Sequence, residues 1–158
     1  IMWMPVQPER LRVTDLFEHL SFQELQDIAA IAQEEEYEAG HVLFKPGDRA
    51  EKIYLIEKGR VSIEIEITPT ERIGVYVLGE GNFFGYPALL PSKTYTTVGT
   101  CLERTKLITI EASRLLSLLE KDPKRGFKVM QKVAELIAKK LADTRRQLVF
   151  CVLPPTRA

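Results

Sequence analysis

A glycine-bounded loop at residues 81–98 carries the residue types best suited to binding a small anion. Residues 87–90 are expected to form one short turn of helix after Gly85, and a helix N-terminus offers free N–H groups and a partial positive charge. Lys93 and the hydroxyl-bearing Thr94 and Tyr95 follow this turn. The loop therefore predicts a seat for a phosphate or other anion. The alternative is a corner between two strands with no ligand.

Metal and catalytic chemistry have little support elsewhere in the sequence. His19 and His41 stand alone, and Cys101 and Cys151 lie far apart with no Cys-x-x-Cys spacing. A cupin-like metalloenzyme would need several histidines and a carboxylate, but only one histidine falls in the region of short strands. Nucleophile elbows and P-loops are absent. We therefore expect no catalytic residue, no metal site, no resident cofactor and no enzymatic activity.

The composition fits one globular domain without a strong electrostatic preference. The chain has 158 residues, of which 45% are hydrophobic and 28% are charged. Lys plus Arg equal Asp plus Glu at 22 each, so no net field would attract nucleic acid or an anionic membrane. No apolar run reaches the roughly 18 residues of a membrane span. We predict a cytoplasmic chain with reduced cysteines and with neither a membrane nor a nucleic acid as its partner.

The elements that would position the loop begin with two helices. Residues 1–13, with Pro5 and Pro8, are expected to form an extended lead-in. Residues 14–20 predict a short helix, and Ser21 to Glu24 form a capping box that opens a second one. The apolar positions of the second helix share one face: Phe22, Leu25, Ile28, Ala29 and Ala32.

Short β-branched and aromatic runs then replace the helical pattern. They are separated by glycine turns and occupy residues 37–39, 41–45, 52–57, 61–67, 72–78, 98–102 and 106–110. The clearest alternation places four residues inward, namely Val61, Ile63, Ile65 and Ile67, and three outward, namely Ser62, Glu64 and Glu66. Seven or eight such strands predict an α+β domain over residues 14–122, mainly a β jelly-roll barrel with flanking helices. Such a barrel holds a cavity open to ligands.

A long helix is predicted at the C-terminal side. Residues 112–120 form a short helix, and Asp122 before Pro123 caps a helix that continues to residue 151, with residues 152–158 as a tail. One apolar stripe has coiled-coil spacing and comprises Phe127, Met130, Ala134, Ile137, Leu141, Thr144 and Leu148. A second stripe comprises Val129, Val133 and Leu136. One stripe can cover the barrel and the other a second copy, which predicts a homodimer; alternatively both cover the barrel. The basic residues of this helix are expected to form a solvated face: Lys124, Arg125, Lys128, Lys132, Lys139, Lys140, Arg145 and Arg146.

Three glycine-anchored motifs, in this order of elements, resemble the cyclic nucleotide-binding domain family. The motifs are GHVLFKPGD at residues 40–48, IYLIEKGRV at residues 53–61 and GEGNFFG at residues 79–85. The family includes the sensory domains of catabolite-activator-type transcription factors, regulatory subunits of cyclic AMP-dependent kinase and gated channels. The resemblance covers roughly residues 14–148 and implies a jelly roll with a phosphate-binding cassette.

The cassette departs from the family pattern at both charged positions. The family uses a Glu for the ribose hydroxyl and an Arg for the cyclic phosphate. Here Gly85, Ala88 or Leu89, and Val98 keep the frame, but Tyr86 stands at the Glu position. Counting back from Val98 places Thr94 at the Arg position and Tyr95 at the following hydroxyl position, with Lys93 one residue short. Tyr86 either bonds a ligand or fills the pocket itself. Lys93 restores a weak anion site only if it turns inward.

The long helix offers one more correspondence. Alignment with the bacterial activators places Thr144 where a Thr reaches the base, followed by Arg145 in place of a small hydroxyl residue. The alternative for Thr144 is a tolerated polar residue at a dimer seam. The helix-turn-helix of the activators would not fit in the ten residues after this helix, so the chain is either a stand-alone module or a sensor domain of a longer protein.

The resemblance and its two departures imply a regulatory module that signals through its long helix. Its degenerate pocket is expected to hold either nothing or a non-standard anionic ligand, and to bind cyclic AMP poorly. Two alternatives stay open. One is genuine binding of cyclic AMP or cyclic GMP through Lys93, and the other is a protein-interaction module without a small ligand.

Overall fold

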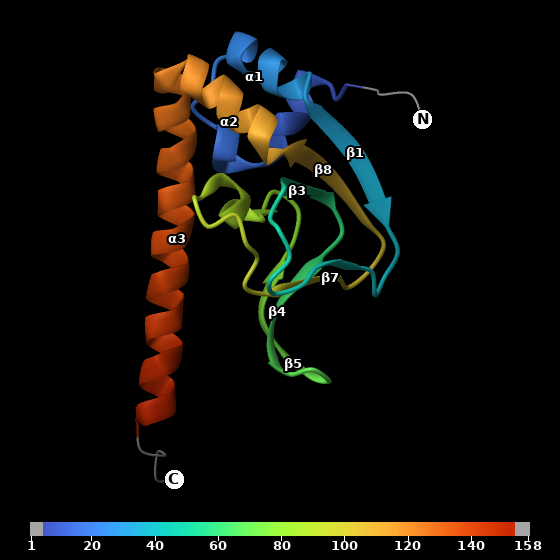
Figure 1. Cartoon of the computed structure of the whole chain (residues 1–158), viewed down its shortest axis with the longest axis vertical. Coiled ribbons are helices and arrows are strands. Elements are labelled where there is room, and N and C mark those ends of the chain that lie inside the picture. Colours follow the sequence, from blue (N-terminus) through green and yellow to red (C-terminus); the bar gives the residue numbers. More distant parts are fainter. Residues whose placement is uncertain (1–4, 154–158) are drawn as a thin grey trace.

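The computed structural model describes residues 5–153 as a β jelly roll flanked by helices (Figure 1). Three short 3-10 turns and three α-helices flank the barrel. They are the 3-10 turns η1 (Pro8–Val13), η2 (Asp15–Phe17) and η3 (Tyr86–Leu89), and the α-helices α1 (Phe22–Ala29), α2 (Ala112–Lys121) and α3 (Pro123–Val152). Eight strands form the barrel: β1 (Ala32–Tyr37), β2 (Val42–Phe44), β3 (Lys52–Lys58), β4 (Val61–Thr68), β5 (Glu71–Leu78), β6 (Phe83–Phe84), β7 (Val98–Cys101) and β8 (Thr105–Glu111).

The strands form two antiparallel four-stranded sheets, in the orders β1-β8-β3-β6 and β2-β7-β4-β5. This arrangement confirms the predicted jelly roll. In the first sheet, strands β3 and β8 pair from Lys52 with Glu111 to Lys58 with Lys106. Long buried runs on both strands show that this sheet is covered on both faces, by the barrel interior on one side and by helical segments on the other.

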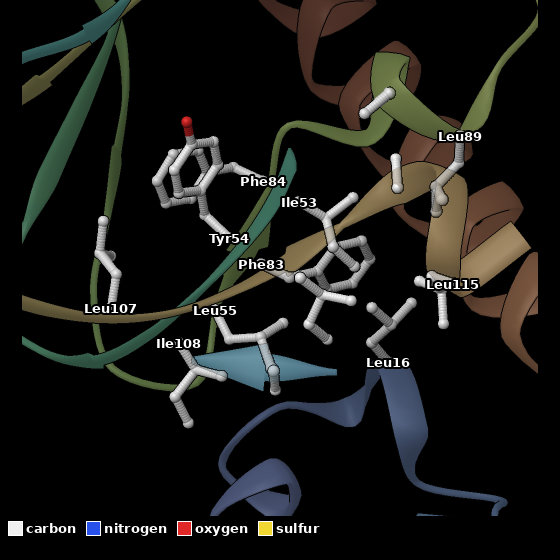
Figure 2. Close-up of a cluster of buried hydrophobic side chains, with 14 of the residues drawn as sticks. Leu16, Ile53, Tyr54, Leu55, Phe83, Phe84, Leu89, Leu107, Ile108 and Leu115 are labelled. Atoms are coloured by element: carbon white, nitrogen blue, oxygen red, sulfur yellow. The ribbon is translucent and has the colours of Figure 1, made fainter. Parts of the chain in front are cut away.

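The main core lies where the helical segments meet strands β3, β6 and β8 (Figure 2). Leu16 of η2, Leu89 of η3 and Leu115 of α2 point toward this cluster from three different elements. The rings of Tyr54 and Phe84 stack with their centroids 4.8 Å apart. The cluster therefore fixes η3, the turn beside the candidate ligand loop, on a rigid base.

The N-terminal segments differ from the sequence-based prediction. Residues 8–13 form η1 with Leu11 completely buried, although an extended lead-in was predicted; residues 1–4 lie outside the described part of the chain. The predicted helix at residues 14–20 is reduced to η2, and Ala32 begins β1 rather than extending α1. Arg10 bonds the carboxylates of Glu34 and Glu57. Such pairing supports a glutamate-rich strand whose residue types have low intrinsic strand preference.

The predicted inward stripe of β4 is correct for only half of its length. Val61 and Ile63 are buried, but Ile65 is 44% exposed and Ile67 is 54% exposed. Strand β4 pairs with β7 only from Val61 to Glu64, and beyond that point its sole strand partner is β5. The end of the β4–β5 hairpin consequently projects from the barrel (Figure 1), and Ser62, predicted to face outward, is buried.

The prediction of a solvated basic face on α3 is wrong for Arg125, whose side chain is only 6% exposed. Its guanidinium bonds Asp27 at 2.9 Å and the carbonyl oxygens of Glu24 and Leu118, so one side chain joins α1, α2 and α3. Lys132 is also largely covered, between Glu18 and Glu135. The long aliphatic and planar parts of these cations pack while their charges are paired.

Helix α3 runs along the side of the barrel and continues past it (Figure 1). Val129 and Val133 of the second stripe are buried, as predicted for the face that covers the domain. Of the coiled-coil stripe, Phe127 and Leu148 are more than 60% exposed, whereas Ile137 is half-buried. No helix in the described part of the chain has the length and apolar character needed to cross a membrane.

Candidate ligand-binding site

A cavity of about 280 Å³ lies between the η3 turn, the barrel and α3. Its walls are mainly aromatic and apolar, with a few hydroxyls and one cation. The barrel and the loop at residues 81–98 contribute Phe44, Ile63, Tyr76, Phe84, Gly85, Tyr86, Pro87, Tyr95, Thr96 and Thr97. Helix α3 contributes Ile137, Lys140, Leu141 and Thr144.

Gly85 sets the direction of the η3 turn. Its φ of +83° lies in the left-handed region, and an added Cβ would lie 2.9 Å from the Lys52 carbonyl oxygen and 3.0 Å from the Tyr54 ring. Only glycine combines this conformation with so close an approach. The turn that follows buries Ala88 and Leu89 in the core and leaves Tyr86 half-buried at the cavity wall.

Helix α3 can form one wall of the cavity because its four lining residues are spaced three or four apart and share one face: Ile137, Lys140, Leu141 and Thr144. The Lys140 ammonium lies 4.3 Å from the centroid of the Tyr76 ring and 5.9 Å from that of Tyr86. Burial lowers the pKa of Lys140. Lys140 is the one charged residue among those that line the cavity, and no carboxylate belongs to that lining.

Tyr76 also ties α3 to the barrel. Its hydroxyl lies 3.4 Å from both the Lys140 carbonyl oxygen and the Thr144 hydroxyl. Thr144 in turn donates to the Lys140 carbonyl oxygen at 2.8 Å. One strand residue therefore forms part of the cavity wall and of the attachment of the helix.

Tyr95 is among the residues that line the cavity, but its hydroxyl is already engaged. It donates to the Lys52 carbonyl oxygen at 2.7 Å, and its ring stacks on Phe44 at 4.0 Å between centroids. Burial raises the pKa of Tyr95 to about 12. Tyr95 is thus a neutral wall residue held in place by the barrel.

Of the other residues predicted for the site, some line this cavity and others lie elsewhere on the domain. Gly85, Tyr86 and Thr144 line the cavity, whereas Ala88 and Leu89 are buried and are not among its lining residues. Lys93 is exposed and lines a separate depression with Arg49, Glu51 and Glu111. Thr94 donates to the Ser92 carbonyl oxygen, and neither it nor the exposed Arg145 is among the residues lining the cavity.

Sequence reasoning missed Lys140 and Tyr76 as site residues. Lys140 could have been found from its spacing, because it lies three residues after Ile137 and four before Thr144 on the same helix face. Tyr76 carried no comparable signal, since only the folded hairpin brings β5 against α3. Among the described residues, no group of three or more His, Cys, Asp or Glu could hold a metal ion.

Comparison with known proteins agrees with the fold. Residues 34–122 match the family model described as the cyclic nucleotide-binding domain. The chain belongs to the cyclic nucleotide-binding domain family. In this cyclic nucleotide-binding domain, the matched segment contains every strand from β2 to β8 and the whole loop at residues 81–98.

Proteins similar to this cyclic nucleotide-binding domain include a channel protein and a cyclic nucleotide-binding protein. A provisionally named potassium channel protein of Rhodopseudomonas palustris is 30% identical over 116 residues, which cover 73% of this chain and 28% of that protein. A solved structure of a provisionally named cyclic nucleotide-binding protein from Geobacter metallireducens is 28% identical, with a TM-score of 0.76, and the match covers 86% of this chain and 98% of that one. The fold is also that of a cyclic nucleotide-binding domain from Methylobacillus flagellatus, at 16% identity and a TM-score of 0.81 over 98% of this chain and 90% of that one.

Proposed function

We propose that this regulatory domain senses a small ligand in the cavity beside η3 and reports its occupancy through α3. The observation that carries the proposal is the double role of Tyr76, whose ring faces the cavity and whose hydroxyl contacts α3 at Lys140 and Thr144. A ligand that breaks or strengthens these contacts changes the relative free energies of two positions of α3 against the barrel, and so shifts the population between them.

We further propose that the cavity is a poor site for cyclic AMP. The residue at the family's Glu position, Tyr86, is uncharged, and no arginine lines the cavity. A hydrogen bond to a charged group contributes about 1.5–3 kcal/mol, so the loss of two such bonds weakens affinity by about tenfold to more than a hundredfold each. The alternative in which Lys93 binds the phosphate is disfavoured because Lys93 lines the separate depression beside Arg49.

Exposed apolar residues on α3 support the proposal that two copies associate through this helix. Phe127 is 66% exposed and Leu148 62%, both in the predicted coiled-coil stripe, whereas Ile137, Leu141 and Thr144 of that stripe line the cavity. If the stripe joins two copies, a movement of α3 in one copy changes its contact with the other. Ligand binding in one copy would then alter how the two copies pack against each other.

A distance measurement between α3 and the barrel tests the signalling proposal. Cys151 is exposed near the end of α3 and Cys101 is buried, so a spin label can be attached to Cys151 selectively. A second label at Ala39→Cys reports on an exposed barrel position. We expect the electron–electron distance distribution to shift at saturating cyclic AMP. An unchanged distribution, when calorimetry confirms saturation, contradicts signalling through α3.

Calorimetry distinguishes poor cyclic nucleotide binding from genuine binding through Lys93. We expect cyclic AMP and cyclic GMP to bind weakly, and Lys93→Ala to leave that affinity unchanged. Micromolar binding that Lys93→Ala abolishes would overturn the placement of Lys93 outside the site and favour the alternative function.

A further inference from the structure

Lys140 is the one charged group in the cavity wall, and it has no acidic counterpart there. The other lining residues are aromatic, aliphatic, glycine, proline or threonine. Across the described residues 5–153, Lys140 forms a cation–π contact with Tyr76 and lies within 6 Å of the Tyr86 ring, but it forms no ion pair. A partly buried cation with no carboxylate partner gains strongly from a bound anion, because attraction to the anion compensates for the hydration that burial removed.

The rest of the wall suits a flat ring. Phe44, Phe84 and Tyr95 lie on the barrel side, and Tyr76 and Tyr86 lie near the Lys140 ammonium. Aromatic faces of this kind stack on planar ligands and exclude water from the charged contact. The volume of about 280 Å³ lies just below the usual range for ligand pockets, roughly 300–1,000 Å³. The cavity thus favours a compact ligand.

We propose that the cavity binds a small aromatic anion, one ring bearing a carboxylate or phosphate group, with the anionic group on the Lys140 ammonium and the ring between Tyr76 and Tyr86. In this arrangement a cation of α3, rather than Lys93 of the loop, holds the anion. Thr96 and Thr97, which also line the cavity, provide neutral hydroxyl donors at its edge. This inference rests on the proposed function, since it uses the same cavity, and it names the class of ligand.

The position of Lys140 also connects the charge to the helix. Its carbonyl oxygen is the acceptor for the Thr144 hydroxyl and lies 3.4 Å from the Tyr76 hydroxyl, while its side chain points over the Tyr76 ring. An anion that draws the ammonium away from this ring therefore acts on the helix segment that Tyr76 holds.

Calorimetry with phenyl phosphate, benzoate and the neutral benzyl alcohol tests the inference. We expect at least one of the two anions to bind the wild-type chain at least tenfold more tightly than benzyl alcohol. Whichever of phenyl phosphate and benzoate binds more tightly shows whether the site prefers a phosphate or a carboxylate group. Lys140→Met keeps an apolar stem and removes the charge, so it should weaken binding of the anions by about tenfold or more. Lys140→Arg, which keeps a cation, should retain most of the affinity.

Lys139→Met is the matched control, because Lys139 is the exposed neighbour on the same helix and does not line this cavity. It should leave anion affinity unchanged. The inference is overturned if neither anion binds, if benzyl alcohol binds as tightly as the anions, or if Lys140→Met retains full anion affinity. Anion binding that depends on Lys140 without movement of α3 would contradict the proposed signalling and leave the ligand class intact. If cyclic AMP moves α3 but no anion binds in a way that depends on Lys140, the ligand class is wrong and the proposed signalling is retained.

Discussion

The ammonium of Lys140 lies 4.3 Å from the centroid of the Tyr76 ring, so a cation of α3 faces an aromatic ring of β5 across one edge of the cavity. The Tyr76 hydroxyl approaches the backbone of the same helix at the Lys140 carbonyl oxygen. Ring and hydroxyl therefore hold α3 in two different ways, and substitution separates them.

Tyr76→Phe should loosen α3 without emptying the cavity wall. The change removes the hydroxyl contacts to α3 and keeps the ring beside Lys140. We expect the free energy of unfolding to fall by only about 0.5–1 kcal/mol, because the lost contacts are long and partly exposed. Hydrogen exchange should accelerate at the amides of residues 137–144 and stay unchanged in β3. Equal protection of α3 in the variant and the wild type would show that the hydroxyl does not attach the helix.

Gly85→Ala should destabilise the domain more than the same change at Gly47. Both glycines have a positive φ, but a Cβ at Gly47 meets nothing within 4 Å, whereas one at Gly85 meets the Lys52 carbonyl oxygen and the Tyr54 ring. Gly47→Ala measures the backbone cost alone, about 1–2 kcal/mol. We expect Gly85→Ala to exceed it in urea denaturation. Equal losses would mean that η3 moves freely to accept the new atom.

The capping box of α1 predicts a loss of stability in acid. The backbone N–H of Ser21 bonds the Glu24 carboxylate, and together with Lys128 it lowers the pKa of Glu24 from the ordinary 4.5. A carboxylate with a depressed folded-state pKa stabilises the fold above its unfolded pKa, and this contribution disappears as pH falls through the folded value. The difference in unfolding free energy between wild type and Glu24→Gln should therefore shrink as pH drops below about 4.5.

Ser21→Ala is a second probe of the same cap. It removes the hydroxyl that accepts from the Glu24 backbone N–H, which should cost about 1 kcal/mol at neutral pH. A difference between wild type and Glu24→Gln that stays constant from neutral pH to pH 3 would show that this carboxylate contributes nothing to the cap.

Association through α3 should depend on its exposed stripe. Leu148→Glu places a charge in the stripe and should shift sedimentation toward the monomer. Gln147→Glu adds the same charge at an adjacent exposed position outside the stripe and should leave the assembly unchanged. A wild-type chain that sediments as a monomer over a wide concentration range would refute the dimer proposal.

The barrel and its order of elements were predictable because glycine turns and β-branched runs mark strand ends and strand cores locally. The glutamates of β1 were not, since their support comes from distant cations such as Arg10 and Arg104. The exposure of Ile65 and Ile67 followed from how far β7 extends alongside β4, which no local pattern contains.

The candidate site was predictable only in part, for a related reason. Gly85, Tyr86 and Thr144 carried signals in the sequence, and each lines the cavity. Lys93 and Lys140 have the same side-chain chemistry, but the turn at Lys93, with a φ of 45°, leaves it outside while the helix carries Lys140 inward. Which lysine faces the cavity is decided by backbone direction and helix rotation rather than by residue type.

Arg125 holds the N-terminal end of α3, its root, in a fixed position against α1 and α2. Its guanidinium is locked between α1 and the end of α2, and the capped start of α3 lies beside it at Asp122. From Arg125 to Val152 the helix extends about 40 Å, at 1.5 Å per residue, so a tilt of about 5° at the root would displace the far end by about 3.5 Å. A tilt of α3 too small to disturb the barrel core therefore moves the far end of the helix by a distance comparable to the separation of two atoms in van der Waals contact.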